Sequence, residues 1–246
     1  MPECRDNHHL EEQILSMSLS DFDDLDAAFR IKGEPMQTHQ GRSVTRLTVD
    51  GQTHFLKRFW LTPTQIFRRF VVQGMHELAM IDWLNSNNFT GPEVVARGAE
   101  KRLGVWRRMM FLMREANDEL PLERFCRKFP DRRDGVLESL ADHTARLHDA
   151  GFYHRDYSER HIFVRCDDGA YTFRQIDLER ATVGPRREAK AAADLKTLSC
   201  SIADPELAGA IEGAFLAVYL AKRGTLESSE SFRELLANAV ATKSFE

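Results

Sequence analysis

Two aspartates joined by a hairpin pattern constrain the fold of this 246-residue chain more than any other feature. The first, Asp156, lies in the run Tyr153–Val164, which reads YHRDYSERHIFV. The second, Asp177, follows two apolar stretches that are separated by the turn sequence Asp167–Gly169. An Asp-Gly pair between two such stretches is a strong signal for a β-hairpin. A hairpin at this place would bring the two acids to the same end of the fold.

The order of residue types around this hairpin is typical of phosphoryl-transfer enzymes. A His-Arg-Asp triplet at 154–156, a metal-ligand type of residue at His161 and a second acid after the hairpin follow the order of a kinase catalytic loop and magnesium loop. Asp156 would accept the proton of the attacking hydroxyl, and Arg155 beside it would pair with a carboxylate. Asp177 would hold the Mg²⁺ that bridges the outer phosphates of ATP. Each signal is weak alone, and their order carries the prediction.

His161 stands five residues after Asp156, where protein kinases carry Asn. Two interpretations stay open at this position. A neutral imidazole can ligate a metal through one nitrogen. Because Mg²⁺ prefers oxygen ligands, the side chain could instead form a hydrogen bond that orients Asp156 or Asp177.

Lys57 is the third expected contact with the nucleotide. It lies in the second of two alternating segments, Thr45–Val49 and His54–Phe59, which an Asp-Gly pair joins as a hairpin. A lysine on such a strand can reach the inner phosphates of ATP, and a carboxylate on the following helix, Glu77, would fix its position. The alternative for Lys57 taken alone is an edge-strand lysine that blocks aggregation.

The expected phosphate-covering loop is degenerate. Gly41 is the only glycine in Thr38–Ser43, and the chain has no Gly-x-Gly-x-x-Gly. Backbone amides beside one glycine could still face the phosphates, so Gly41 is a candidate nucleotide-binding residue.

The pattern of segments predicts an α+β chain of two lobes. Alternating segments in the first half predict an antiparallel sheet, and the second half is mostly helical. We place the boundary at the polar segment that begins at 115. Residues 1–114 would form an N-terminal lobe with the nucleotide-covering sheet and helix, and residues 115–246 a C-terminal lobe with the catalytic and magnesium loops. The expected helices are 21–30, 63–73, 75–85, 122–129, 134–150, 188–201 and more from 205 onward, and the expected strands beyond the two hairpins are 94–96 and 106–113.

Composition and charge narrow the classes of partner. The net charge is −4 and the sequence pI is near 6.2, so we expect no binding of nucleic acid. The four cysteines are far apart and no Cys-x-x-Cys occurs, which fits free thiols in a reducing cytoplasm. The first twelve residues carry four acids and no apolar run, so we expect no signal peptide. Five basic pairs could be solvated, or could contact an anionic acceptor or acidic head groups: Arg68-Arg69, Arg107-Arg108, Arg127-Lys128, Arg132-Arg133 and Arg186-Arg187.

The segment after Asp177 bears on the acceptor. It spans only 16 residues before Asp194, and the chain has no Ala-Pro-Glu of the kind that ends a protein-kinase activation segment. A short segment leaves the acceptor site open, which favours a small or carbohydrate acceptor over a folded protein. Asp194 is expected to hold the backbone of the catalytic loop, with an ordinary helix-terminal acid as the alternative.

Together these motifs resemble the lipopolysaccharide core kinases, the heptose and Kdo kinases of Gram-negative bacteria. The resemblance is carried by the catalytic loop with His161 in place of Asn and by Ile176–Ala181, IDLERA, in place of Asp-Phe-Gly. The segment Phe55–Phe59 and the helix with Glu77 extend it to about Leu47–Leu198. The family has the two-lobed protein-kinase-like fold, and we expect the same fold here.

The resemblance implies transfer of the ATP γ-phosphate to a sugar hydroxyl of the lipopolysaccharide inner core, heptose or Kdo. ATP and Mg²⁺ would be the cofactors, with Asp156 as base, Asp177 and His161 as metal site, Lys57 as phosphate anchor and Glu77 as its partner. The acceptor would be a glycolipid. The protein would be a cytoplasmic monomer that could also contact the inner membrane peripherally. Two alternatives remain, a Ser/Thr protein kinase-like enzyme and a nucleotide-binding pseudokinase with a regulatory or stress role.

Overall fold

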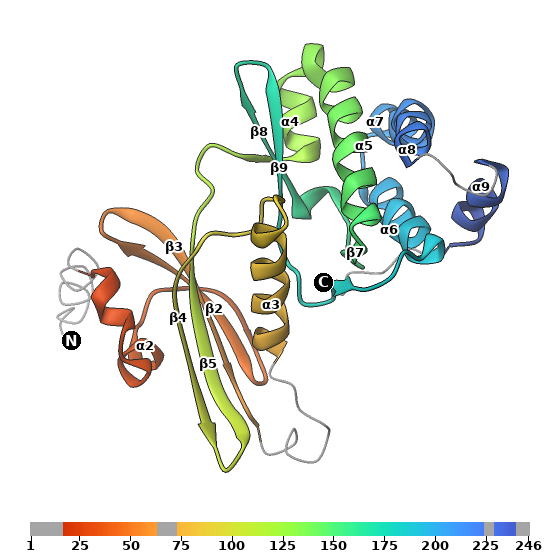
Figure 1. The fold of residues 1–246 in the computed structure, drawn as a ribbon. Coiled ribbons are helices and arrows are strands. Elements are labelled where there is room, and N and C mark those ends of the chain that lie inside the picture. The colour runs from red at the N-terminus through yellow and green to blue at the C-terminus, as the bar shows by residue number, and fades with distance from the viewer. Residues whose placement is uncertain (1–16, 63–72, 224–228, 240–246) are drawn as a thin grey trace, which may run out of the picture. The chain divides into compact units, whose positions relative to one another are not determined.

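The computed structural model describes residues 17–62, 73–223 and 229–239, and these divide into two compact units (Figure 1). The first unit holds the described residues up to Ala79 together with Pro92–Asn117. The second holds Met80–Gly91 together with the described residues from Asp118 onward. The chain therefore passes between the units three times, the first time inside helix α3 (Gln73–Ser86).

The first unit is built on a five-stranded antiparallel sheet with the order β1-β2-β3-β5-β4, as the alternating segments predicted. Asp50 and Gly51 join β2 to β3 with φ angles of 48° and 72°, the left-handed conformation that a two-residue hairpin turn requires. Alternate side chains of β2, β3 and β5 point to one face and form the core of this unit with Phe22 and Ala28. The strands are β1 (Glu34–His39), β2 (Arg42–Val49), β3 (Gln52–Trp60), β4 (Val94–Arg102) and β5 (Val105–Arg114).

Two short helices precede the sheet, η1 (Leu19–Phe22) and α2 (Leu25–Arg30). The sequence predicted one helix over 21–30, which is wrong because Asp24 interrupts it. The backbone of Asp24 is extended, and its carboxylate accepts hydrogen bonds from the second and third amides of α2, so it starts a new helix as an N-cap. The predicted helix over 63–73 lies, except for its last residue, outside the described residues.

The second unit is mostly helical, as predicted. Its short strands form the sheet β6-β8-β9 and the pair β7-β10. Helix α5 lies between the β8–β9 hairpin and α8, and its buried face contributes to the core of the unit (Figure 1). The helices are α4 (Leu122–Lys128), α5 (Arg133–Asp149), α6 (Glu188–Ser201), α7 (Pro205–Ala210), the π-turn η5 (Ile211–Phe215), α8 (Leu216–Arg223) and α9 (Ser229–Asn238), with the 3₁₀ turns η3 (Pro130–Arg132) and η4 (Glu159–His161). The strands are β6 (Leu120–Pro121), β7 (Phe152–Tyr153), β8 (Ile162–Asp167), β9 (Ala170–Gln175) and β10 (Thr182–Val183).

Gly151 ends α5 and turns the chain toward the predicted catalytic loop. Its φ is 79°, a conformation that costs glycine little, and its amide donates to the carbonyl of His148 (3.0 Å). A Cβ at Gly151 would collide with the backbone carbonyl of Gly184. The backbone just after β10 can therefore pass close to the end of α5 only because residue 151 has no side chain.

No helix within the described residues is long and apolar enough to cross a membrane.

Candidate active site

The β8–β9 hairpin leads directly to Asp177. The two strands pair in antiparallel through a turn at Asp168 and Gly169, so the hairpin that the sequence predicted is present. One step beyond β9, the amide of Ile176 donates to the carbonyl of His161 (3.1 Å). This bond holds the residue before Asp177 against the turn η4, and it brings the side chains of His161 and Asp177 to the same place.

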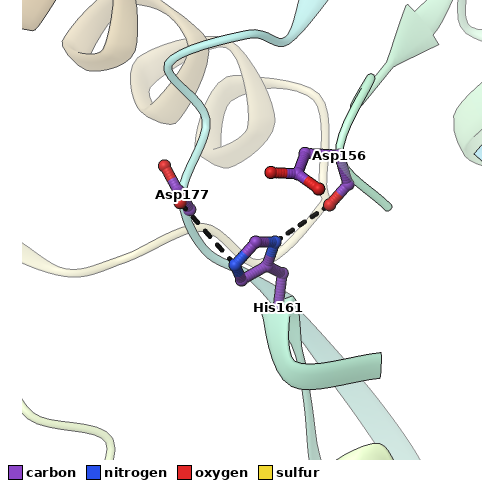
Figure 2. A group of neighbouring side chains, drawn as sticks. All are labelled: Asp156, His161 and Asp177. Atoms are coloured by element: carbon purple, nitrogen blue, oxygen red, sulfur yellow. Dashed lines mark hydrogen bonds and ion pairs between the residues drawn. The ribbon is translucent and has the colours of Figure 1, made fainter. Parts of the chain in front are cut away.

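Asp156, His161 and Asp177 form one cluster (Figure 2). One ligand atom from each lies within 4.8 Å of the other two. His161 stands between the two acids: its Nδ1 is 2.9 Å from the backbone carbonyl oxygen of Asp156, and its Nε2 is 3.6 Å from Asp177 Oδ2. The structure thus gathers the three residues that the sequence assigned to the base and the metal site.

The hydrogen bond to Asp156 decides the tautomer of His161. Nδ1 also lies 3.0 Å from the hydroxyl oxygen of Ser158, which can donate or accept, whereas the carbonyl oxygen can only accept. A proton on Nδ1 is the arrangement that suits both contacts. In the neutral ring, Nε2 then carries a lone pair, which faces the Asp177 carboxylate. Nε2 and the carboxylate oxygen are both hydrogen-bond acceptors, so they do not attract each other. A cation between them removes this conflict. The geometry therefore accommodates both earlier interpretations, because His161 orients the backbone of Asp156 through one nitrogen and offers the other to a metal.

Asp156 supplies a further reason to expect a ligand. The residue is buried, and its Oδ1 has no hydrogen-bond partner within the part of the chain that the structure describes. A buried carboxylate oxygen without a donor is costly, and such atoms mark places where an ion, a water or a substrate binds. Two carboxylates and one imidazole nitrogen fit a divalent cation, and the oxygens suit Mg²⁺.

Arg155 and Asp177 both adopt the left-handed backbone conformation, with φ of 63° and 57°. For residues with a side chain this costs about 1–2 kcal/mol each. Such strain persists only where surrounding contacts impose it, and it collects at functional sites. The side chain of Arg155 is exposed, and no carboxylate in the described ranges lies within ion-pair distance of it, so the predicted pairing is not seen.

Asp194 imposes the backbone of this loop. Its Oδ1 accepts the amide of Arg155 (2.7 Å) and its Oδ2 accepts the amide of His154 (2.8 Å). Asp194 lies on α6 and is 1% exposed, so both bonds are shielded from water. The prediction that Asp194 holds the catalytic-loop backbone is confirmed.

His154 was not singled out from the sequence. Its Nε2 lies 2.9 Å from the carbonyl of Ile176, the residue before Asp177, and must donate to it. Burial lowers the pKa of His154, so the ring stays neutral. The ring also stacks on His161, with an interplanar angle of 10°. The place of His154 in the His-Arg-Asp triplet could have marked it as a functional residue. Its hydrogen-bond partner, the carbonyl of Ile176 beyond the hairpin, could not be predicted from sequence spacing.

The first unit carries the predicted nucleotide contacts. Lys57 Nζ on β3 donates to Glu77 Oε1 on α3 at 2.6 Å. Glu77 is 1% exposed and the Lys57 side chain 14%, so the pair is largely removed from water. Gly41 lies in the turn between β1 and β2 with φ of 86°, and its carbonyl accepts the amide of Trp60 (2.9 Å). The structure joins Lys57 with Glu77, and it places Gly41 in the turn before β2, the strand that pairs with the Lys57 strand β3.

Comparison with known proteins identifies the family. The family model "Lipopolysaccharide kinase (Kdo/WaaP) family" matches residues 27–219. Among solved structures the chain is similar to WaaP in complex with acyl carrier protein, with a TM-score of 0.64, 19% identity, and coverage of 87% of this chain and 89% of that chain. It is also similar to an aminoglycoside-3'-phosphotransferase of type VIII, with a TM-score of 0.51, 17% identity, and coverage of 88% and 98%. A comparison with curated proteins gave no significant match.

The structural matches confirm the predicted α+β kinase-like fold. The family model spans well over half of the chain, and it confirms the prediction of a phosphotransferase that acts on sugar hydroxyls. The chain belongs to the lipopolysaccharide kinase (Kdo/WaaP) family.

Proposed function

We propose that the protein transfers the γ-phosphate of ATP to a hydroxyl of a Kdo or heptose residue in the lipopolysaccharide inner core. The observation that carries the proposal is the cluster of Asp156, His161 and Asp177, with the buried and unpartnered Oδ1 of Asp156. A positioned carboxylate of this kind can accept the proton of an attacking hydroxyl. Family membership supplies the class of acceptor.

Asp156 is the proposed base. Its backbone is fixed by His161 through the carbonyl and by Asp194 through the preceding amide, so the carboxylate is held before the substrate arrives. Such pre-organisation lowers the cost of reaching the transition state, because the group does not have to be ordered during the reaction. Arg155, exposed beside it, is the proposed contact with an anionic group of the substrate.

Asp177 and His161 Nε2 are the proposed metal ligands, and Asp177, which is 45% exposed at its side chain, remains accessible to a nucleotide. Mg²⁺ held there would neutralise charge on the transferring phosphates. Lys57 is the proposed anchor of the inner phosphates, and the hydrogen bond that its ammonium donates to Glu77 keeps it in one position. Gly41 is the proposed backbone contact.

The segment between Asp177 and α6 is short in the structure as well. It contains only a turn at Glu179 and Arg180, the two-residue strand β10 and a bend at Pro185 before Glu188. This favours a sugar acceptor over a folded protein, which would need a longer docking segment.

The proposed function includes contact of the protein with the inner membrane. Arg124, Arg127 and Lys128 lie at i, i+3 and i+4 on α4 and are exposed, so they share one face of the helix. Lys128 and Arg132 both lie near the ring of Phe129, at 5.3 and 5.4 Å. This group of four cations fits the anionic head groups of a membrane surface.

The membrane contact is tested by sedimentation with vesicles of neutral lipid or of neutral plus anionic lipid, at low and high salt. Binding only to anionic vesicles, lost at high salt and lost in Arg124→Gln/Lys128→Gln, is expected. Arg102→Gln, which alters an exposed arginine on β4, is the matched control. Equal sedimentation at both salt concentrations would reject the contact.

The reaction is tested with γ-labelled Mg-ATP and purified core lipopolysaccharide. Label on the glycolipid is expected with the wild type and with Asp167→Asn, an exposed acid on the β8 strand, and not with Asp156→Asn. ATP binding is measured in parallel for each variant. ATP binding without transfer in the wild type would overturn the acceptor assignment, and full transfer by Asp156→Asn would overturn the assignment of the base.

A further inference from the structure

We infer that Tyr219 and His148 are positioning residues for the catalytic loop, which they control through Asp194. The inference rests on the proposed function for its kinetic consequence, but not for its structural one. Tyr219 lies on α8 and His148 near the end of α5, and neither belongs to the cluster around Asp156. The three side chains form a buried chain of polar contacts that ends at the loop backbone.

The first link is between His148 and Asp194. His148 Nε2 lies 3.4 Å from Asp194 Oδ2, the same oxygen that accepts the amide of His154. His148 is fully buried and Asp194 nearly so. Two backbone amides donate hydrogen bonds to Asp194, and the Nε2 edge of His148 faces the carboxylate at ion-pair distance without a hydrogen bond of good geometry.

The second link fixes which nitrogen of His148 carries the proton. Tyr219 Oη lies 2.8 Å from His148 Nδ1. If Nδ1 donated to the phenol oxygen, Nε2 would turn a lone pair toward the carboxylate of Asp194, which is unfavourable. The favourable assignment has Tyr219 donating its O–H to Nδ1, so that Nε2–H faces Asp194. Burial raises the pKa of Tyr219, which keeps the phenol protonated and able to donate.

The chain of contacts acts on a strained backbone. Arg155 holds φ of 63° while its amide donates to Asp194 Oδ1. If Asp194 rotates or loses a donor, this amide is released and the loop can relax toward a less strained conformation, which moves Asp156. Removing the phenol oxygen of Tyr219 should therefore alter the position of Asp156, although Tyr219 does not contact Asp156.

Tyr219→Phe is the test, with Phe232→Leu as the matched control. Phe232 packs on the ring of Tyr219 (5.8 Å between centroids) and has no polar atom, so its truncation loosens the same part of the core without altering the polar chain. The first readout is hydrogen–deuterium exchange of the amides of His154 and Arg155 in the full-length protein. We expect about tenfold faster exchange at these two amides in Tyr219→Phe, and no change there in Phe232→Leu.

The second readout is the kinetic split. In Tyr219→Phe we expect kcat to fall about tenfold while KM for ATP stays within about twofold, since only the placement of the base is affected. His148→Gln, which keeps an N–H near Asp194, should retain more activity than His148→Leu. In Phe232→Leu the melting temperature should fall while kcat is unchanged.

The two readouts separate the possible failures. A wild type that transfers no phosphate to core lipopolysaccharide rejects the proposed function, and the exchange rates still decide the inference. Unchanged exchange at His154 and Arg155 in Tyr219→Phe, or equal acceleration in Phe232→Leu, overturns the inference whatever the activity.

Discussion

Replacing Asp194 by Asn should cost far more stability than the loss of one charge suggests. The carboxylate accepts two backbone amides with two different oxygens, and both bonds are buried. An asparagine at 194 has one carbonyl oxygen, so its amide group must face one of the two backbone N–H groups. One hydrogen bond to a charged acceptor is lost, and one buried donor is left without a partner.

The magnitude follows from these two losses. A hydrogen bond to a charged group contributes about 1.5–3 kcal/mol, and an unsatisfied buried donor costs about 1–3 kcal/mol. We therefore expect Asp194→Asn to lower the free energy of unfolding by about 3–5 kcal/mol. With a urea dependence of about 3 kcal/mol per M, the unfolding midpoint would fall by about 1 M or more.

Asp204→Asn is a control with the same chemistry at the surface. Asp204 Oδ1 accepts the amides of Glu206 (2.9 Å) and Leu207 (3.3 Å) as the N-cap of α7. One oxygen accepts both, water is close, and Asn caps helices as well as Asp does. We expect a change below about 0.5 kcal/mol. Urea unfolding followed by circular dichroism measures both variants, and equal midpoints for the two would refute the reasoning.

The remaining predictions address the other buried groups and two glycines. Lys57→Ala should lose ATP binding and about 3–5 kcal/mol of stability, because it removes the ammonium paired with the buried Glu77 carboxylate. In a thermal shift assay, Lys57→Met/Glu77→Leu should regain most of that stability, but it should not regain ATP binding. Burial lowers the pKa of His143 to about 3. Since the unfolded chain takes up this proton below about pH 6.5, stability should fall between pH 6.5 and 3, by roughly 2 kcal/mol at pH 5, and unfolding curves of His143→Gln should show a weaker pH dependence over that window. Gly151 and Gly169 both have a positive φ, but only a Cβ at residue 151 would meet a backbone atom. In urea unfolding, Gly151→Ala should therefore destabilise the protein more than Gly169→Ala, which should cost about 1 kcal/mol.

The sequence predicted most where local chemistry sets the structure. The bounds of α6 were predicted at both ends, and both Asp-Gly hairpins were found from their turn residues alone. The prediction from sequence failed at Asp24. An aspartate can lie inside a helix or cap the start of a new one, and the backbone conformation of the residue decides between the two. Short-range pattern does not contain that information.

The candidate site shows the same division. Spacing was enough to select the acids and His161, because the hairpin between them has a fixed geometry. It could not give the left-handed backbone of Arg155 and Asp177, which side chains distant in sequence impose. The link from Tyr219 to the loop joins residues more than sixty positions apart, and no periodicity encodes it.

The three passages of the chain between the two units have a consequence for synthesis. Met80–Gly91 leaves the ribosome early but belongs to the unit whose other residues begin at Asp118. Its side chains Ile81, Leu84 and Phe89 are buried; Phe89 contacts the ring of His143 and Trp83 stacks on Phe152, at 5.6 and 5.3 Å between ring centroids. Until residue 152 and the helices around it have emerged, this apolar segment has no partner in its own unit. Slow translation beyond Asn117 should therefore prolong its exposure to chaperones and to aggregation, whereas the five strands of the first unit are already complete by that point.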